Sequence, residues 1–590
     1  MLHRHSAKQK RPRTLVYHRE ELHSPKLEEA GLLPEQIHGL HLGTVMENQS
    51  ASENGGSHFQ PNRYRIPQKG LPEATAYDLI HNELSLDGNP HLNLASFVNT
   101  ETSAIATKLI TENINKNLAD NDEYPQLIEL TQRCISMLAQ LWHCDEDKYD
   151  PLGCATTGSS EAIMLGGLAM KKRWEHRMRG AGKSTAKPNI LMSTASQVAL
   201  EKFARYFDVE CRLIPVSAKS NHCLDPQLLW DYVDENTIGA FVILGTTYTG
   251  HLESVEHVCD VLTEIENAHP DWSNTEIPIH VDGASGGFIV PFTFSERQMA
   301  SYRMQRWGFN HPRVMSINAS GHKFGLTTPG LGWVLWRSED LLADELKFKI
   351  NYLGGVEESF GLNFSRPGFQ VIHQYYNFVS LGRAGYHAHF AKSIFVARAF
   401  CHELLVSERM PGFFEVVSSI HERIDAPPGR SRLPDSVNEY WEKPAEFKPG
   451  VPLAAFKLSR AFHDQYPEIP QSMLAALLRS RGWIVPNYPL PSSTDGSDQH
   501  EVLRVVFRSE MKLDLAQLLI VDIEHVVTKL IKSYKILLES LPANEHSQHR
   551  RDFVYKMLLK LASPTSGDEP PLELQPERRE SLSKNYKGTC

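Results

Sequence analysis

The sequence has 590 residues, 41% of them hydrophobic and 22% charged, with a formal net charge of −10. This balance is typical of a globular protein and offers no basic surface for nucleic acid. No run approaches the roughly 20 apolar residues of a membrane helix, so no membrane partner is expected. The eight cysteines form no C-x-x-C pair and no H-E-x-x-H motif occurs, which indicates reduced thiols, a cytoplasmic location and no metal site.

Composition divides the chain into five parts. Residues 1–65 are rich in polar and basic residues and end near the flexible Asn54–Ser57, which predicts a disordered N-terminal extension. Their acid-free start resembles a mitochondrial presequence, but Pro12 interrupts any helix and no amphipathic arginine face is present. The other parts are an N-terminal segment (66–125), a large domain (126–393), a small domain (394–543) and a tail (544–590).

Apolar runs of strand length alternate with helical stretches from Gly153 to about Arg337. The runs are Ile190–Met192, Arg212–Ile214, Ala240–Leu244, Ile277–Val281 and Val314–Ile317. The helical stretches between them include Glu161–Met178, Val198–Tyr206 and Val255–Ala268. Such alternation predicts an α/β fold with a mostly parallel sheet and helices on both faces. In that architecture ligands bind at the carboxyl ends of the strands.

The small domain shows a different pattern. Strands are predicted at Leu453–Leu458, Trp483–Val485 and Val502–Val506, with helices at Gln471–Leu478 and Asp514–Leu538. Together they predict an α+β domain. Between the helical stretch that follows Pro367 and these strands, Asp425–Gly450 is rich in Pro, Arg and Glu, which favours an exposed insertion.

Two of the predicted strand ends carry residues suited to an anion or a cation. Gly158, Ser159 and Ser160 stand where a helix begins, so free amides and hydroxyls there could hold a phosphate; a plain serine cap is the alternative. Asp282 follows the run that ends at Val281. A carboxylate there needs a cationic partner, in a ligand or in a structural ion pair.

The third strand end carries a lysine. Lys323 lies in Ser320–Gly325 after the last strand-like run, and its ammonium is costly to bury without a purpose; a solvated loop is the alternative. A phosphate cradle, a strand-end aspartate and a strand-end lysine together suit pyridoxal 5′-phosphate. The lysine would form the imine, and the aspartate would pair with the protonated pyridine nitrogen and keep the ring an electron sink.

Several motifs make a family resemblance specific. TTGSSEAIMLGG, HVDGASGGF, SINASGHKFG and NFSRPG occur in family order, and the chain resembles the glutamate decarboxylases among the pyridoxal-phosphate-dependent decarboxylases, over roughly residues 67–540. The long N-terminus and the ending Tyr586–Cys590 resemble the fungal form. The resemblance implies the aspartate aminotransferase type of fold, with a seven-stranded large-domain sheet, and decarboxylation of L-glutamate to 4-aminobutyrate and CO2 through a cofactor aldimine.

The resemblance also implies roles for individual residues. Lys323 matches the aldimine lysine, Asp282 the partner of the pyridine nitrogen, Ala284 a residue that packs on the ring, and Gln197 the residue on its opposite face. Ser365 matches a residue that reaches the phosphate of a neighbouring subunit, which implies a homodimer or a higher homo-oligomer. The remaining cofactor contacts are the phosphate ligands Ser159, Ser160, Ser320 and His322, and Thr247, which could otherwise be a turn residue.

Substrate selection is implied at five positions, namely Ser96, Phe97, Asn117, Asp120 and Arg504. Arg504 would offer a two-pronged donor to a substrate carboxylate. Asp120 would meet a carboxylate, which favours mildly acidic conditions because one of the two groups must be protonated. The segment 66–125 would thereby contribute to the substrate pocket and the dimer.

Three alternatives stay open at this stage. The same cofactor machinery would serve a decarboxylase of another amino acid, and a catalytically silent regulatory or scaffold protein could share the fold. The basic amphipathic stretch Arg550–Leu561 could dock on calmodulin, as tails of plant relatives do, although its sequence does not match theirs. A helix packed on the body of the protein is the simpler interpretation.

Overall fold

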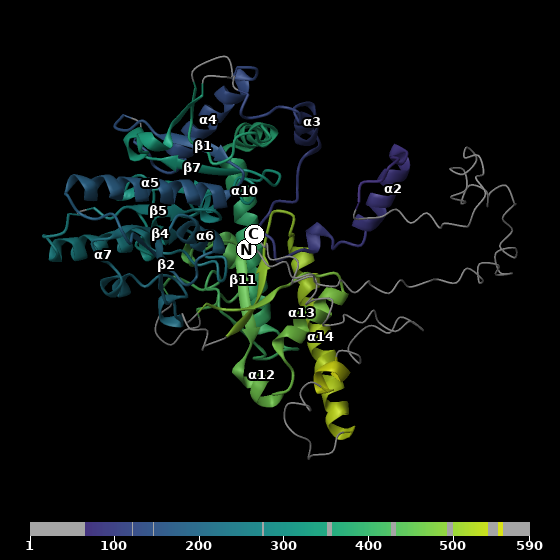
Figure 1. The fold of residues 1–590 in the computed structure, drawn as a ribbon. Coiled ribbons are helices and arrows are strands. Elements are labelled where there is room, and N and C mark those ends of the chain that lie inside the picture. The colour runs from purple at the N-terminus through teal and green to yellow at the C-terminus, as the bar shows by residue number, and fades with distance from the viewer. Residues whose placement is uncertain are drawn as a thin grey trace, which may run out of the picture. The chain divides into compact units, whose positions relative to one another are not determined.

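The computed structural model describes residues 65–540, apart from 121, 146, 274–275, 351–356, 426–431 and 492–499, together with residues 553–558 (Figure 1). Residues 1–84 and 85–590 form separate compact units, so α2 (Glu73–Leu84), which buries no residue, is described by itself. The extension predicted over residues 1–65 lies almost wholly outside the described residues. Within the described ranges, every helix is too short or too polar to cross a bilayer.

A seven-stranded sheet forms the centre of the large domain. Its strand order is β1-β7-β6-β5-β4-β2-β3, and β7 is antiparallel to both neighbours while the other pairs are parallel. This confirms the mostly parallel sheet. The strands are β1 (Leu152–Thr156), β2 (Asn189–Ser193), β3 (Glu210–Ile214), β4 (Thr237–Ile243), β5 (Ile279–Asp282), β6 (Val314–Ala319) and β7 (Gly332–Trp336).

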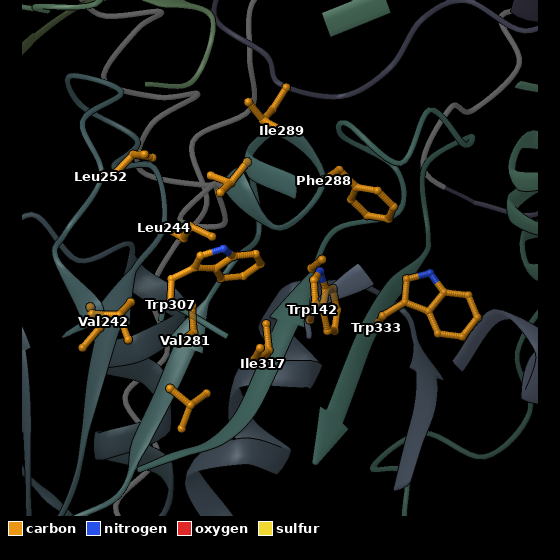
Figure 2. Close-up of a cluster of buried hydrophobic side chains, with 14 of the residues drawn as sticks. Trp142, Val242, Leu244, Leu252, Val281, Phe288, Ile289, Trp307, Ile317 and Trp333 are labelled. Atoms are coloured by element: carbon orange, nitrogen blue, oxygen red, sulfur yellow. The ribbon is translucent and has the colours of Figure 1, made fainter. Parts of the chain in front are cut away.

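Helices cover both faces of this sheet, because successive strand residues point to opposite sides. Phe241 belongs to a core with α5 and α6, whereas the next residue, Val242, belongs to a second core with α4, α7 and α8. Figure 2 shows part of the second core, including Val242, Trp142 and Trp333. The helices are α4 (Pro125–Leu141), α5 (Ser159–Gly180), α6 (Val198–Tyr206), α7 (Val255–Ala268), α8 (Gly286–Thr293) and α9 (Glu296–Ser301).

Two helical segments that meet at a kink at Gly382 make up α10 (Phe369–Val406), and α10 joins the large and small domains (Figure 1). The part of α10 up to Ile394 packs in the same core as α4, α7 and α8, through residues such as Phe390 and Ile394. Its last part packs in a third core, through Val396 and Phe400. The change of core between Ile394 and Val396 supports a domain division near residue 393. The five-part division of the chain remains our proposal.

The small domain is built on a four-stranded antiparallel sheet, ordered β10-β11-β13-β12. The strand predicted at Trp483–Val485 is wrong: Ile484 makes only an isolated bridge with Asn93, and the strand begins after Pro486, which has no N–H for a sheet ladder. The elements are β10 (Phe414–Val416), β11 (Leu453–Leu458), β12 (Asn487–Pro489), β13 (Glu501–Val506), α12 (Arg460–Gln465), α13 (Gln471–Ser480) and α14 (Leu513–Ser540).

The segment predicted to be an exposed insertion is anchored where the structure describes it. Tyr440 and Phe447 are buried, and the buried Arg398 donates to the carbonyls of Ile420, Pro444 and Lys448 at 3.0–3.2 Å. The fully buried guanidinium explains why this polar segment is held in place, since its donors need acceptors. The expectation was therefore wrong at the buried anchors, whereas Trp441–Pro444 are exposed as predicted.

Short elements connect the larger ones. They are η3 (Pro90–Leu92), α3 (Ala104–Glu112), η4 (Ala218–Ser220), η5 (Pro226–Asp231), η6 (Glu339–Leu341), η7 (Asp344–Leu346), β8 (Phe348–Ile350), β9 (Glu357–Ser359), α11 (Glu439–Glu442) and η8 (Pro444–Glu446). In the tail, residues 553–558 are helical, and Val554 and Leu558 are buried in the core of the small domain.

Trp142 gives a direct test of the large-domain core. Its side chain is fully buried, and its indole Nε1 donates to the carbonyl of Gly287 at 2.8 Å, which ties the end of α4 to α8. We expect Trp142→Phe to lower the free energy of unfolding by about 1–3 kcal/mol, because a buried hydrogen bond and packing volume are lost. Trp230→Phe, at a position 44% exposed, is the control. Equal urea midpoints for the two cofactor-free variants would contradict the expectation.

Candidate active site

The turn after β6 carries Lys323 into the interior. The backbone N–H of Asn99 donates to the carbonyl of His322 at 2.8 Å, so the N-terminal segment holds the turn from one side. The Lys323 ammonium makes no hydrogen bond or ion pair with any described residue, and lies 5.2 Å from the centre of the Phe97 ring. Burial lowers its pKa, although the nearby Asp282 carboxylate opposes the shift. A lysine held without an acceptor is suited to react with a ligand.

Asp282 ends β5, on the strand next to β6, and is only 4% exposed. Its Oδ1 accepts from the backbone N–H of Ala284 at 3.1 Å and from Asn318 Nδ2 at 3.0 Å. In the described part of the chain its Oδ2 has no hydrogen-bond donor. One oxygen is thus fixed by the protein, and the other remains for a cationic ligand atom.

The predicted phosphate cradle forms where α5 begins. Ser159 Oγ and Ser320 Oγ lie 2.7 Å apart, which brings the start of α5 to the lysine turn. A β-carbon at Gly158 would lie 3.3 Å from His322 Cε1, so the absence of a side chain keeps the space beside the imidazole open. Ser160 is exposed at the same helix end. Hydroxyls and free helix amides at one point suit a phosphate.

His322 is suited to donate to this cradle. Burial, together with the Lys323 ammonium, lowers its pKa to about 4, so the ring is neutral near pH 7. Its Nδ1 accepts from the backbone N–H of Leu331 at 3.3 Å. The ring proton therefore resides on Nε2.

The loop after β4 is held by four donors of the small domain, an arrangement we call the carbonyl clamp. Four consecutive residues of the loop each offer a carbonyl oxygen. Those of Thr247, Tyr248, Thr249 and Gly250 accept, in that order, from Arg504 Nη1 (2.8 Å), Tyr488 Oη (3.1 Å), Ser418 Oγ (2.8 Å) and the backbone N–H of Val451 (3.0 Å). The position of the loop is therefore set by the other domain.

Arg504 lies between two aromatic rings. Its guanidinium carbon is 5.0 Å from the centre of Phe97 and 5.3 Å from that of Tyr488, and its Nη2 donates to the carbonyl of Ala95. Its Nε is buried without a hydrogen-bond partner among the described residues. The backbone contacts fix the plane of the guanidinium, and unused N–H groups remain for a ligand.

Three of the expected residues gather in a separate group. Asn117 Nδ2 donates to Asp120 Oδ1 at 2.9 Å and to Ser365 Oγ at 3.3 Å. No hydrogen bond or ring contact within the described ranges joins this group to Lys323 or Asp282. The exposed Ser365 lies on the surface, where a second chain could meet it.

Two further residues have local hydrogen bonds. Gln197 Oε1 caps α6 by accepting from the backbone N–H of Ala199 at 2.7 Å, which leaves its amide group for another contact. Ser96 Oγ accepts from the backbone N–H of Val98 at 3.1 Å. Sequence reasoning missed Asn318 and Tyr488, since only the pairing of distant strands brings them to the site.

Three observations indicate that these residues are suited to bind pyridoxal 5′-phosphate. Within the described part of the chain, Lys323 has no acceptor and Asp282 Oδ2 has no donor, and the hydroxyls of Ser159 and Ser320 meet at the start of α5, where Gly158 has no side chain. These are the groups needed for an amine that reacts with an aldehyde, for a partner of a pyridine nitrogen and for a phosphate site.

Comparisons with known proteins agree. A family model described as the pyridoxal-dependent decarboxylase conserved domain matches residues 75–423. A glutamate decarboxylase of Saccharomyces cerevisiae is 64% identical over 100% of both chains, and glutamate decarboxylase 5 of Arabidopsis thaliana is 42% identical over 79% of this chain and 84% of its own. The solved glutamate decarboxylase of Lactobacillus brevis has a TM-score of 0.68 at 34% identity, covering 80% of this chain and 96% of its own.

Fold and site together define a pyridoxal-phosphate-dependent enzyme with the aspartate aminotransferase type of fold. Within that class, the chain belongs to the pyridoxal-dependent decarboxylase family. The resemblance deduced from the motifs is thereby confirmed.

The buried histidines predict a pH dependence of stability. Burial lowers the pKa of His280 to about 4, whereas a histidine in an unfolded chain titrates near 6.5. Between these values the unfolded state binds more protons, so this contribution is complete above about pH 6.5 and is lost as pH falls toward 4. We expect His280→Gln to reduce the stability lost between pH 7 and pH 5 by about 2 kcal/mol, measured by urea unfolding of the cofactor-free protein. Parallel pH curves for variant and wild type would contradict a neutral His280.

Proposed function

We propose that this protein decarboxylates L-glutamate to 4-aminobutyrate and CO2 with pyridoxal 5′-phosphate. The observation that carries the proposal is the shared position of Lys323 and Arg504 around one ring. Lys323 Nζ and Arg504 Cζ lie 5.2 Å and 5.0 Å from the centre of Phe97. A cofactor lysine and a carboxylate-binding guanidinium are thus within the length of one amino-acid substrate. The similar proteins named glutamate decarboxylase support the substrate.

Different residues have different roles in the proposed reaction. Bound pyridoxal phosphate supplies the electron sink that allows a carboxylate to leave as CO2. Asp282 Oδ2 holds the proton on the pyridine nitrogen, while Ser159, Ser320 and His322 hold the phosphate. Because burial lowers the pKa of Lys323, its amine is more readily neutral and can act as the nucleophile.

Further contacts complete the cofactor site. Ser160 would add a phosphate contact, Thr247 would contact the cofactor from the clamped loop, and Ala284 and Gln197 would pack against the ring. Release of CO2 leaves the substrate carbon in need of a proton. Lys323, which bonds to no acceptor in the described ranges and can take up or release a proton, is suited to carry that proton to it.

Substrate choice depends on two carboxylates. Arg504 has unused N–H groups for one of them, beside Phe97 and Ser96. Asn117 and Asp120 receive the other, and Asp120 must share a proton with it because two like charges cannot be in contact. A decarboxylase of an aromatic or basic amino acid would have no use for this pair.

We also propose that the active unit is a homodimer, in which Asn117, Asp120 and Ser365 serve the site of the partner chain. These three residues bond to one another but not to Lys323 within the described part of the chain. Leu362 and Phe364 beside them are 46% and 40% exposed, as expected for a surface that a second copy covers. A symmetric dimer would complete both sites at once.

Free cysteines bear on the cellular location, and burial of the tail helix bears on its partner. The proposed location is the cytoplasm, in keeping with the seven free cysteines of the described residues. Burial of Val554 and Leu558 in the small-domain core supports a tail helix packed on its own body. We therefore propose no calmodulin partner.

A substrate panel tests the activity. Wild-type protein with added cofactor should release CO2 from glutamate at least about 100-fold faster than from aspartate, tyrosine or histidine, because tyrosine and histidine lack a second carboxylate and the side chain of aspartate is one methylene shorter. Lys323→Ala should lose this turnover together with the visible absorbance of the lysine-bound cofactor. Lys108→Ala, an exposed lysine of α3, should keep both. Turnover in Lys323→Ala would disprove the role of this lysine, and a faster rate with another amino acid would disprove the substrate.

Mixed dimers test the contribution of the partner chain. One chain carries Lys323→Ala and the other Ser365→Asp, whose charge would repel the phosphate. If Ser365 acts across the interface, each mixed dimer keeps one intact site, and random mixing restores about a quarter of the wild-type activity. If Ser365 acts within its own chain, every site is defective and co-expression restores nothing. The measurement is the rate of the co-purified mixture against the two single variants.

A further inference from the structure

Polar side chains form a buried hydrogen-bonded chain behind Asp282. Asp282 Oδ1 accepts from Asn318 Nδ2 at 3.0 Å, Asn318 Oδ1 lies 2.8 Å from His280 Nε2, and His280 Nδ1 lies 2.7 Å from Ser316 Oγ. Asn318, His280 and Ser316 are fully buried. The register of β5 and β6 creates the chain, because Asp282 pairs with Asn318 and His280 with Ser316.

Helix α5 leaves room for this row of hydrogen-bonded side chains. A β-carbon at Gly166 of α5 would lie 2.3 Å from His280 Nδ1, so only glycine allows the imidazole to lie against the helix. The ring of Phe241 contacts the imidazole from the neighbouring strand, with ring centres 5.4 Å apart. The position of His280 is thus determined by packing as well as by hydrogen bonds.

The chemistry of each group fixes the direction of the chain. A carboxylate can only accept, so Asn318 turns its NH2 group to Asp282 and its carbonyl oxygen to His280. His280 must then carry its proton on Nε2, and its Nδ1 accepts from the Ser316 hydroxyl. Every donor points toward Asp282. Such an ordered set of donors fixes the orientation of the carboxylate.

We propose that Asn318 is a positioning residue for the cofactor. By holding Oδ1 of Asp282 with an N–H donor, it fixes the carboxylate and leaves Oδ2 for the pyridine nitrogen. The proposal rests on the proposed function, in which Asp282 pairs with that nitrogen. A plain space-filling role for Asn318 is the alternative.

An isosteric change separates the two roles. Asn318→Asp keeps the volume but replaces the donor with an acceptor, so the two carboxyl groups must share a proton and Asp282 loses charge. Asn318→Ala removes the donor and also the volume. Under the proposal Asn318→Asp is the more harmful change for cofactor binding, and under a space-filling role Asn318→Ala is.

Cofactor affinity is the measurement. Cofactor-free protein is titrated with pyridoxal 5′-phosphate, and binding is followed by tryptophan fluorescence without substrate. We expect the dissociation constant to rise about 10-fold in Asn318→Ala, as for one lost hydrogen bond to a charged group, and about 100-fold in Asn318→Asp. Equal or tighter binding by Asn318→Asp than by Asn318→Ala would overturn the proposal.

Asn189 provides a matched control. It is also a fully buried strand asparagine, which donates to Asp234 Oδ1 at 2.7 Å and accepts from Thr237 Oγ1 at 2.8 Å, but it lies at the amino end of β2. Asn189→Ala should lower stability while the cofactor affinity stays within about twofold, since no ligand is expected at that edge. An equal loss of affinity in Asn189→Ala would assign the effect to general destabilisation and overturn the proposal.

Asp282→Ala separates the proposal from the function on which it rests. If Asp282→Ala binds the cofactor as tightly as the wild type, the pairing of Asp282 with the pyridine nitrogen is wrong. If Asp282→Ala binds weakly and Asn318→Asp binds normally, the pairing stands and only the role of Asn318 is wrong. Weak binding in both supports the proposal.

Discussion

The site depends on the carbonyl clamp that joins the two domains. Each of its four hydrogen bonds contributes only about 0.5–1.5 kcal/mol net, so their importance is geometric more than energetic. Arg504 takes part in the clamp through Nη1, and its Nε has no partner among the described residues, so we propose that its remaining N–H groups serve the substrate. Any shift of the small domain would therefore move Thr247 and reorient Arg504 together. Cofactor contact and substrate recognition cannot change independently in this fold.

The site also concentrates groups that are unfavourable without a ligand. Among the residues that the structure describes, Lys323 has no acceptor, Asp282 Oδ2 has no donor, and the buried Arg504 Nε has no partner. Each costs free energy that the rest of the protein must supply, because buried charges and donors prefer partners. A ligand that brings an aldehyde, a pyridine nitrogen, a phosphate and a carboxylate satisfies all of them. Binding should thus stabilise the folded protein as well as start the chemistry.

Much of the large domain could be predicted because its strands are short runs of apolar residues with helices between them. α6 and α7 have the predicted bounds, Val198–Tyr206 and Val255–Ala268. The missed strand β1, with the sequence LGCAT, has weak strand propensity and forms because β7 pairs with it. In the small domain, Pro486 shifted the strand that periodicity predicted at Trp483–Val485.

The sequence could indicate where the candidate site lies but could not identify all of its residues. Lys323 and Asp282 follow predicted strands whose carboxyl ends meet at one edge, and Ser159 stands at a predicted helix start, so the sequence pointed to one region of the fold for all three. Asn318 and Tyr488 carry no such signal, since their role depends on strand register and on contact between domains. The backbone contacts of Arg504 could not be predicted either, because every residue has a carbonyl group and the sequence does not show which of them accepts a hydrogen bond.

The carbonyl clamp has a consequence for how the protein is made. The lysine, the aspartate and the phosphate cradle all leave the ribosome before any clamp donor has been synthesised, and Arg504 follows last. Until Arg504 is made, the carbonyl of Thr247 lacks its donor and the guanidinium that flanks Phe97 is missing. A nascent chain thus carries the reactive lysine for a long interval without the enclosure that selects its substrate. Completion of β13 is the step at which an unselective amine becomes part of a selective enzyme.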